Sequence, residues 1–157
     1  MSAVSLRDVE EQDIKLFFEF MQSPKQQWQA AFIPKDPSDL DKHLLHWQKI
    51  MLDPTVINKT ILLNDKVVGN IGRWVLDGIG QITFWIDEAY EGQNIATTAL
   101  RQYLVLDELR PLEGRCAFDN LASARVLEKN GFVSTGTDRY FANARNEEIT
   151  EFVFRLL

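Results

Sequence analysis

The residues best suited to chemistry lie at positions 90–100, which read YEGQNIATTAL directly after a strand-like stretch. The first N–H groups of a helix have no partner inside the helix, and with the helix dipole they form a site for anions. Gly92 lets a ligand approach the backbone closely, and Asn94 tolerates a left-handed conformation. Ala96 and Thr97 are too small to block a bulky phosphate. These residue types suit a pyrophosphate bound by main-chain donors; the alternative is a core helix whose first turn happens to be small.

Helices and strands around these residues must position them, and the hydrophobic pattern of the sequence predicts where those helices and strands lie. Strands are expected at residues 4–9, 56–63, 66–76, 80–87, 114–118, 133–142 and 149–157. Helices are expected after Asp8, after Ser38, from residue 95 and within residues 119–131. This order predicts a mixed α/β (α+β) fold with a mainly antiparallel sheet flanked by helices.

Local signals give the expected helix ends. Asp8 with Glu11, and Ser38 with Asp41, have the spacing of capping boxes. The pairs Ser23-Pro24 and Asp53-Pro54 are predicted to end the first two helices, with a loop rich in Gln and Trp between them. The pair Asn130-Gly131 is typical of a left-handed C-cap.

Composition narrows the class of protein. The chain has 157 residues, which fits a single domain over residues 1–157, and its net charge of -6 is a poor basis for binding nucleic acid or an anionic membrane. We see no signal peptide and no apolar run long enough to cross a bilayer. The only cysteine, Cys116, excludes an intramolecular disulfide and a cysteine zinc cluster. We therefore expect a cytoplasmic protein.

Two histidines, His43 and His46, are three residues apart on an expected helix. This spacing can bind a metal, but no other histidine and no cysteine lies nearby in the sequence. A polar helix face explains the pair better, so we expect no metal site.

A second stretch, DNLASARVLEKNGF at residues 119–132, follows an expected short strand. With Asn120, Ser123 and the ending Lys129–Phe132, it resembles a signature of the Gcn5-related N-acetyltransferases (GNAT). Residues 91–96 resemble the acetyl-CoA loop of that family, Arg/Gln-x-x-Gly-x-Gly/Ala. The Asn-x-x-Ser pattern is similar to the branch that acetylates ribosomal-protein N-termini.

Three residues depart from the family pattern. Glu91 stands where the family prefers Arg or Gln, and it would weaken pyrophosphate binding unless its side chain points away. Asn94 replaces a preferred Gly. Leu127 stands where many relatives carry a tyrosine general acid, so that route is closed here.

The resemblance implies direct transfer of an acetyl group from acetyl-CoA to a primary amine, either a protein N-terminus or a small molecule. The alternative is a non-catalytic domain, or one that binds another acyl-CoA. Coenzyme contacts are implied at Trp85, Ile86, Glu91, Gly92, Gln93, Asn94, Ile95, Ala96, Thr97, Asn120, Ser123 and Lys129. Arg125 is a further candidate for the adenosine phosphate.

Five residues are candidates for catalytic roles. By analogy, Ser123 protonates the leaving thiolate, and Asn120 contacts the coenzyme arm or caps its own helix. Tyr140 is an alternative acid, although a strand tyrosine more often packs. Asp138 or Glu88 could act as the base, and a water relay serves equally well.

The acceptor side is expected at the first two helices and their connecting loop, where Trp28 and Phe32 could line a cleft or close the core. The expected partners are acetyl-CoA and an amine, with no nucleic acid and no membrane. The chain is expected to be a monomer or a homodimer.

Overall fold

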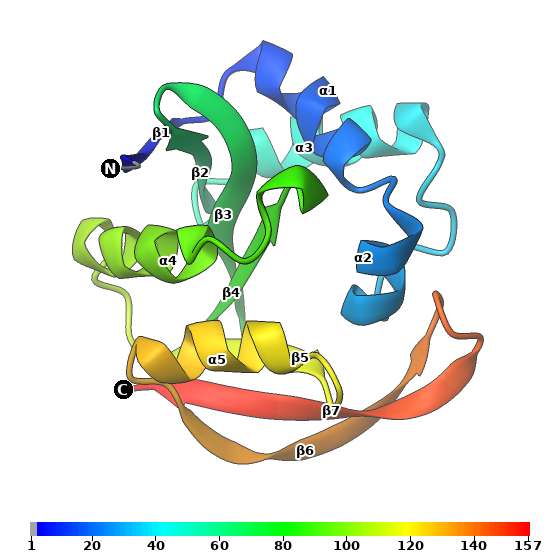
Figure 1. The fold of residues 1–157 in the computed structure, drawn as a ribbon. Helices are drawn as coiled ribbons and strands as arrows, with labels where there is room; N and C mark the ends of the chain where they lie inside the picture. The colour runs from blue at the N-terminus through cyan, green and yellow to red at the C-terminus, as the bar shows by residue number, and fades with distance from the viewer. Residues whose placement is uncertain (1–2) are drawn as a thin grey trace.

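The computed structural model describes residues 3–157, which form one seven-stranded sheet and its covering helices (Figure 1). The strands are β1 (Val4–Asp8), β2 (Ile57–Leu63), β3 (Lys66–Leu76), β4 (Ile79–Ile86), β5 (Leu112–Ala117), β6 (Val133–Ala142) and β7 (Glu147–Leu156). The helices are α1 (Glu11–Phe20), α2 (Pro24–Ala30), α3 (Leu40–Leu52), α4 (Ile95–Leu106) and α5 (Leu121–Lys129), with a 3-10 turn η1 (Glu88–Tyr90).

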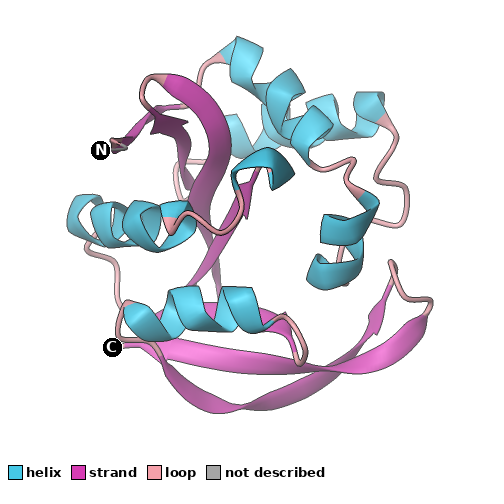
Figure 2. Ribbon diagram, in the orientation of Figure 1, coloured by secondary structure: helices cyan, strands magenta, loops and turns pink. Residues whose placement is uncertain are grey.

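The sheet has the strand order β1-β2-β3-β4-β5-β7-β6, and β4–β5 is its one parallel pair among the described residues. The prediction of a mixed, mainly antiparallel sheet flanked by helices is confirmed (Figure 2). The parallel pairing spans three residue pairs, from Gly80↔Leu112 to Ile82↔Gly114. Beyond Ile82, β4 has no partner on the side of β5, so backbone groups and space become available there.

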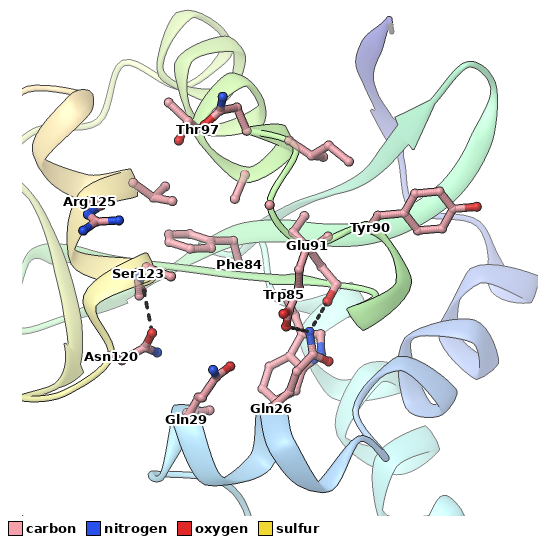
Figure 3. Close-up of a pocket in the computed structure, with 18 of the residues that line it drawn as sticks. Gln26, Gln29, Phe84, Trp85, Tyr90, Glu91, Thr97, Asn120, Ser123 and Arg125 are labelled. Carbon is pink, nitrogen blue, oxygen red and sulfur yellow. Dashed lines mark hydrogen bonds between the residues drawn. The ribbon is translucent and has the colours of Figure 1, made fainter.

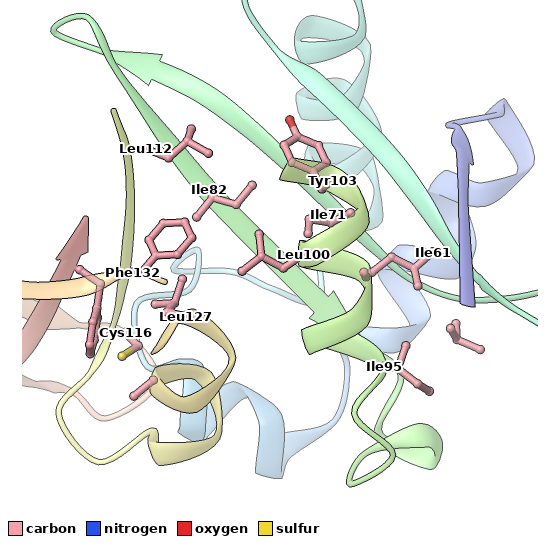
Figure 4. Packing of buried hydrophobic residues seen from close by; sticks show 14 of the residues in the cluster. Ile61, Ile71, Ile82, Ile95, Leu100, Tyr103, Leu112, Cys116, Leu127 and Phe132 are labelled. Atoms are coloured by element: carbon pink, nitrogen blue, oxygen red, sulfur yellow. The ribbon is translucent and has the colours of Figure 1, made fainter. Parts of the chain in front are cut away.

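The main core lies between the sheet and the pair α4 and α5 (Figure 4). Leu100 and Tyr103 of α4 and Leu127 of α5 are almost fully buried in it. Gly114 of β5 allows α5 to approach closely, because a Cβ there would lie 2.5 Å from Cδ2 of Leu127. This close approach sets the position of the α5 N-terminus relative to the open end of β4.

Helices α1 and α3 form a separate core. Phe17 of α1 and Trp47 of α3 stack with ring centroids 5.2 Å apart, and Val67 of β3 packs against them. Val67 and its neighbour Val68, which belongs to the main core, point to opposite faces of the sheet as successive strand residues do. The sheet is therefore covered on both faces.

The prediction for Ser23-Pro24 was wrong. This pair begins helix α2 instead of only ending α1, because Ser23 is the N-cap and accepts a hydrogen bond from the Gln26 amide, with Pro24 at the first helical position. Proline is favoured there, since its missing N–H would have no partner in the first turn. The expected loop thus contains a third N-terminal helix.

Two predicted caps are also shifted. Glu10 and Asp13, not Asp8 and Glu11, form the capping box of α1, and Asp39, not Ser38, caps α3. Asp8 belongs to β1. The expected left-handed Gly131 is confirmed, with a φ of 88°.

Candidate active site

A cavity of about 480 Å³ lies between the end of β4, the N-terminal half of α4, helix α5 and helix α2 (Figure 3). Its lining includes most of the residues expected to contact a coenzyme: Trp85, Ile86, Glu91, Gly92, Asn94, Ile95, Ala96, Thr97, Asn120, Ser123 and Lys129. Gln93 is not among the lining residues. Further lining residues that the sequence did not single out include Gln26, Gln29 and Tyr90.

The loop before α4 presents unpaired backbone donors. Asn94 is the N-cap of α4 and has the left-handed conformation that its residue type tolerates, with φ 59° and ψ 21°. Gly92 also has a positive φ, 77°, and has open space where a Cβ would be. Among residues 3–157, no acceptor is found for the backbone N–H groups of residues 92–97. This cradle fits a ligand that carries phosphate oxygens.

Glu91, the departure from the family pattern, is held away from that cradle. Its carboxylate accepts a hydrogen bond from Gln26 Nε2 at 2.8 Å and pairs with Lys25 Nζ at 3.0 Å, so it points to α2. Figure 3 shows the side chain directed at Gln26. The Glu91 side chain therefore points away from the amides that would bind a pyrophosphate, and it does not oppose binding there.

Gln26 is the centre of this arrangement. It is 8% exposed, donates also to the Ile86 carbonyl at 2.7 Å, and accepts from Trp85 Nε1 at 3.1 Å. A hydrogen bond between Ser23 and Glu88 adds a further link between α2 and the segment after β4. Glu88 is thereby engaged with α2.

The N-terminus of α5 forms the facing wall. Asn120 caps the helix, because its Oδ1 accepts the Ser123 amide at 3.3 Å. The Ser123 hydroxyl has no hydrogen-bond partner among residues 3–157 and lines the cavity. Arg125 and Lys129 follow on the same helix and bring two positive charges to the lining.

A second cavity, of about 370 Å³, adjoins the first. Both are lined by Ala30, Phe84, Trp85, Asn120 and Ser123. The second cavity extends over Phe32 and Ile33, which follow α2, and over β5 and β7. Its charged lining residues are Arg115 and Glu151, neither of which was singled out in the sequence.

Asp138 and Tyr140 lie on β6, outside both cavity linings. The Asp138 carboxylate accepts a hydrogen bond from Arg115 Nη1 at 2.7 Å, and the Tyr140 side chain is 52% exposed. Trp28 is also exposed and lies against the Arg145 guanidinium, away from either lining.

Cys116 lines the second cavity and is 5% exposed. Burial, with the nearby charge of Glu151, raises the pKa of its thiol to about 11. The side chain is therefore kept as a neutral thiol at physiological pH. Leu127, at the position of the family's tyrosine, is 1% exposed and belongs to the core.

The sequence model of the Acetyltransferase (GNAT) domain matches residues 4–133. The chain belongs to the GNAT acetyltransferase family. The resemblance to this family inferred from the loop and from the Asn-x-x-Ser helix is thus confirmed. A ribosomal-protein-serine acetyltransferase of Escherichia coli (strain K12) is 35% identical over 65 residues, which are 39% of this GNAT chain and 36% of that protein. The match thus spans little more than a third of the curated relative.

Solved structures share the whole fold of this GNAT domain. A ribosomal L7/L12 α-N-protein acetyltransferase in complex with coenzyme A superposes with a TM-score of 0.78 at 19% identity, over 96% of this chain and 92% of that one. A spermidine N-acetyltransferase from Vibrio cholerae, in complex with CoA and spermine, gives a TM-score of 0.79 at 15% identity, over 97% and 95%.

Within residues 3–157, no group of three or more His, Cys, Asp or Glu side chains is placed to hold a metal ion. His43 instead contacts the Ile14 carbonyl through Nε2 at 2.9 Å. None of the helices in the described part of the chain combines the length and apolar character that a membrane crossing requires.

Proposed function

We propose that this protein is an acetyl-CoA-dependent N-acetyltransferase that transfers the acetyl group directly to a primary amine. The observation that carries the proposal is the row of unpaired amides at residues 92–97, which opens on a cavity large enough for a coenzyme arm. Family membership supports it, as do the coenzyme A complexes of two structural neighbours.

In this proposal the chain binds and orients the coenzyme through three groups of residues. The amides of residues 92–97 receive the pyrophosphate, and Arg125 and Lys129 receive the adenosine phosphate. The free edge of β4 from Phe84 to Ile86 receives the pantetheine arm and polarises the thioester carbonyl. Positioning of the two reactants supplies most of the acceleration.

Ser123 is the proposed proton donor to the leaving thiolate. Its support is its place in both cavity linings, where a hydroxyl can meet the sulfur on one side and the amine on the other. Asn120 contributes by fixing the first turn of α5 through its cap, and its amide group remains available to the coenzyme arm. The second cavity is the proposed acceptor site.

Calorimetric titration of the purified protein with acetyl-CoA tests the proposal. We expect micromolar binding, equivalent to about -8 kcal/mol. 3′-Dephospho-CoA should bind more weakly, and S-acetylpantetheine, which lacks the pyrophosphate, weakest of all. Absence of binding to acetyl-CoA would contradict the proposal.

The alternative of a non-catalytic acyl-CoA-binding domain predicts the same binding but no transfer. Release of free CoA on addition of an amine separates the two functions. We further propose that the enzyme works in the cytoplasm, as a monomer or homodimer. The low cysteine content, a single Cys116 and so no intramolecular disulfide, fits a reducing compartment.

A further inference from the structure

The second cavity has an unusual balance of groups on its walls. Most of its surface comes from apolar and aromatic side chains, among them Phe32, Ile33 and Trp74. Its charged lining residues are one carboxylate, Glu151, and one guanidinium, Arg115. A buried carboxylate in an apolar cavity is costly, so it calls for an explanation in terms of a ligand.

Glu151 lies on β7, opposite Ala117 of β5 and Asp138 of β6. The residue is 8% exposed, and its Oε1 accepts a hydrogen bond from Arg115 Nη1 at 3.1 Å. Oε2 has no hydrogen-bond partner among residues 3–157. One oxygen is thus fixed by the protein and the other is free for a ligand.

The surroundings of Glu151 leave its charge only partly compensated. Arg115 is the one cation among residues 3–157 that contacts it. The same Nη1 atom also donates to Asp138 at 2.7 Å, and Nη2 of this guanidinium pairs with Glu113 at 2.8 Å. Burial is the largest cause that raises the pKa of Glu151, and repulsion from Asp138 and Glu113 adds to it, against the opposite effect of Arg115. A carboxylate in this state gains from the arrival of an ammonium group.

We propose that Glu151 binds the ammonium group of the acceptor in the second cavity and removes its proton. The inference rests on the proposed transferase function. Ser123 lies at the boundary of the two cavities, so an amine held by Glu151 faces the same place as the thioester.

The proton balance of the step is complete. The ammonium group loses one proton to Glu151, which later releases it to solvent. The neutral nitrogen forms a bond with the acetyl carbon, and the carbon–sulfur bond breaks. The nitrogen then loses a second proton to the Ser123 hydroxyl, and this hydroxyl donates its own proton to the thiolate sulfur.

The same walls define the class of acceptor. One carboxylate can compensate one ammonium. The rest of the lining is apolar, neutral and polar (Gln81, Thr83, Asn120 and Ser123) or, at Arg115, cationic. A second cationic centre would find no second carboxylate in this lining, and apolar groups and Arg115 both disfavour it. The cavity therefore suits a primary amine with a single charge and an apolar body, a description that includes a peptide N-terminus with an apolar side chain, and it disfavours polyamines.

The test uses three amines as acceptors: phenylalaninamide, 2-phenylethylamine and spermidine. CoA release is measured with the wild type, with Glu151→Gln and with the matched control Glu148→Gln, an exposed residue of the same strand. We expect kcat/KM for the two aromatic monoamines to fall roughly 100-fold or more in Glu151→Gln, as for loss of a general base. The control should keep its activity, and spermidine should be the poorest acceptor.

Two measurements keep the variant interpretable. Its affinity for acetyl-CoA, measured by calorimetry, should equal that of the wild type, because Glu151 does not line the first cavity. Its melting temperature at neutral pH should be unchanged or higher, because the raised pKa means that ionised Glu151 costs folding free energy.

The outcomes separate the two proposals. A wild type that does not bind acetyl-CoA overturns the proposed function, and this inference with it. A wild type that acetylates the monoamines, with Glu151→Gln equally active, overturns the role of Glu151 alone. Binding without acetylation of either monoamine, or a preference for spermidine, overturns the acceptor class.

Discussion

At the scale of single residues, the proposed coenzyme site depends on small side chains at the start of α4. Ala96 lines the first cavity just after the left-handed Asn94. A leucine is well tolerated in a helix but fills space that the phosphates need. Ala96→Leu should therefore lower the affinity for acetyl-CoA at least tenfold, which is about 1.4 kcal/mol, with little effect on stability.

Calorimetric titration and thermal unfolding of Ala96→Leu check this prediction. The matched control is Ala89→Leu, the same change at an exposed position in η1 that does not line the cavity. Equal affinities in the two variants would show that the first turn of α4 is not the phosphate site.

At the scale of elements, α2 and the loop before α4 are joined through Gln26. In Gln26→Leu, the Glu91 carboxylate loses the buried one of its two partners on α2 and keeps only the exposed Lys25. It can then turn toward the amide cradle, where it opposes the pyrophosphate. We expect weaker binding of acetyl-CoA. The added substitution Glu91→Gln removes the charge and should restore most of the affinity.

This double variant distinguishes electrostatic repulsion from simple loss of structure, which a second substitution would not repair. S-acetylpantetheine is the ligand control, because it has no pyrophosphate and its binding should be insensitive to the charge at Glu91. If Gln26→Leu and the double variant are equally weak, Gln26 acts by packing alone.

At the scale of the whole molecule, buried ion pairs join distant elements. Asp13 of α1 meets Arg7 of β1 at 2.6 Å, and Asp107, after α4, meets Arg73 of β3 at 2.8 Å. Burial alone would raise the pKa of both carboxyls, but hydrogen bonds, mainly from these arginines, lower it below the usual range. Their contribution to stability is therefore present above the unfolded-state pKa and is lost as pH falls through the folded-state pKa.

The fold should accordingly be sensitive to acid. Asp107→Asn should reduce the free energy of unfolding by about 3 kcal/mol at pH 7, as for a buried pair that loses one partner. At pH 3 the difference from the wild type should shrink, because this pH lies below the ordinary aspartate pKa of about 3.9 and the carboxyl of the unfolded chain is then mostly protonated. Urea unfolding at both pH values measures this, with the exposed neighbour Glu108→Gln as control. A difference that is independent of pH would contradict the assignment.

Much of this protein could be read from short stretches of sequence. Four features depend only on residues within one or two helical turns of each other. They are the left-handed Asn94, the small side chains in the first turn of α4, the Asn120 N-cap and the left-handed Gly131 at the end of α5. The order of the strands along the chain and the mixed, mainly antiparallel character of the sheet also followed from local patterns. The prediction of a loop after Ser23-Pro24 was wrong because proline is favoured both just after a helix and at the first position of the next one.

Only the tertiary structure determined which side chains lie beside the proposed coenzyme and acceptor sites. Gln26 reaches Glu91 across 65 positions of the chain, and Arg115 reaches Glu151 across 36, so neither contact leaves a local pattern. The sequence left Asp138, Glu88 and a water relay as alternatives for the base. The fold brings Glu151 into the second cavity because β7, and not β6, lies beside β5 where β4 and β5 separate. A strand order that depends on long-range pairing therefore determines which carboxylate meets the amine.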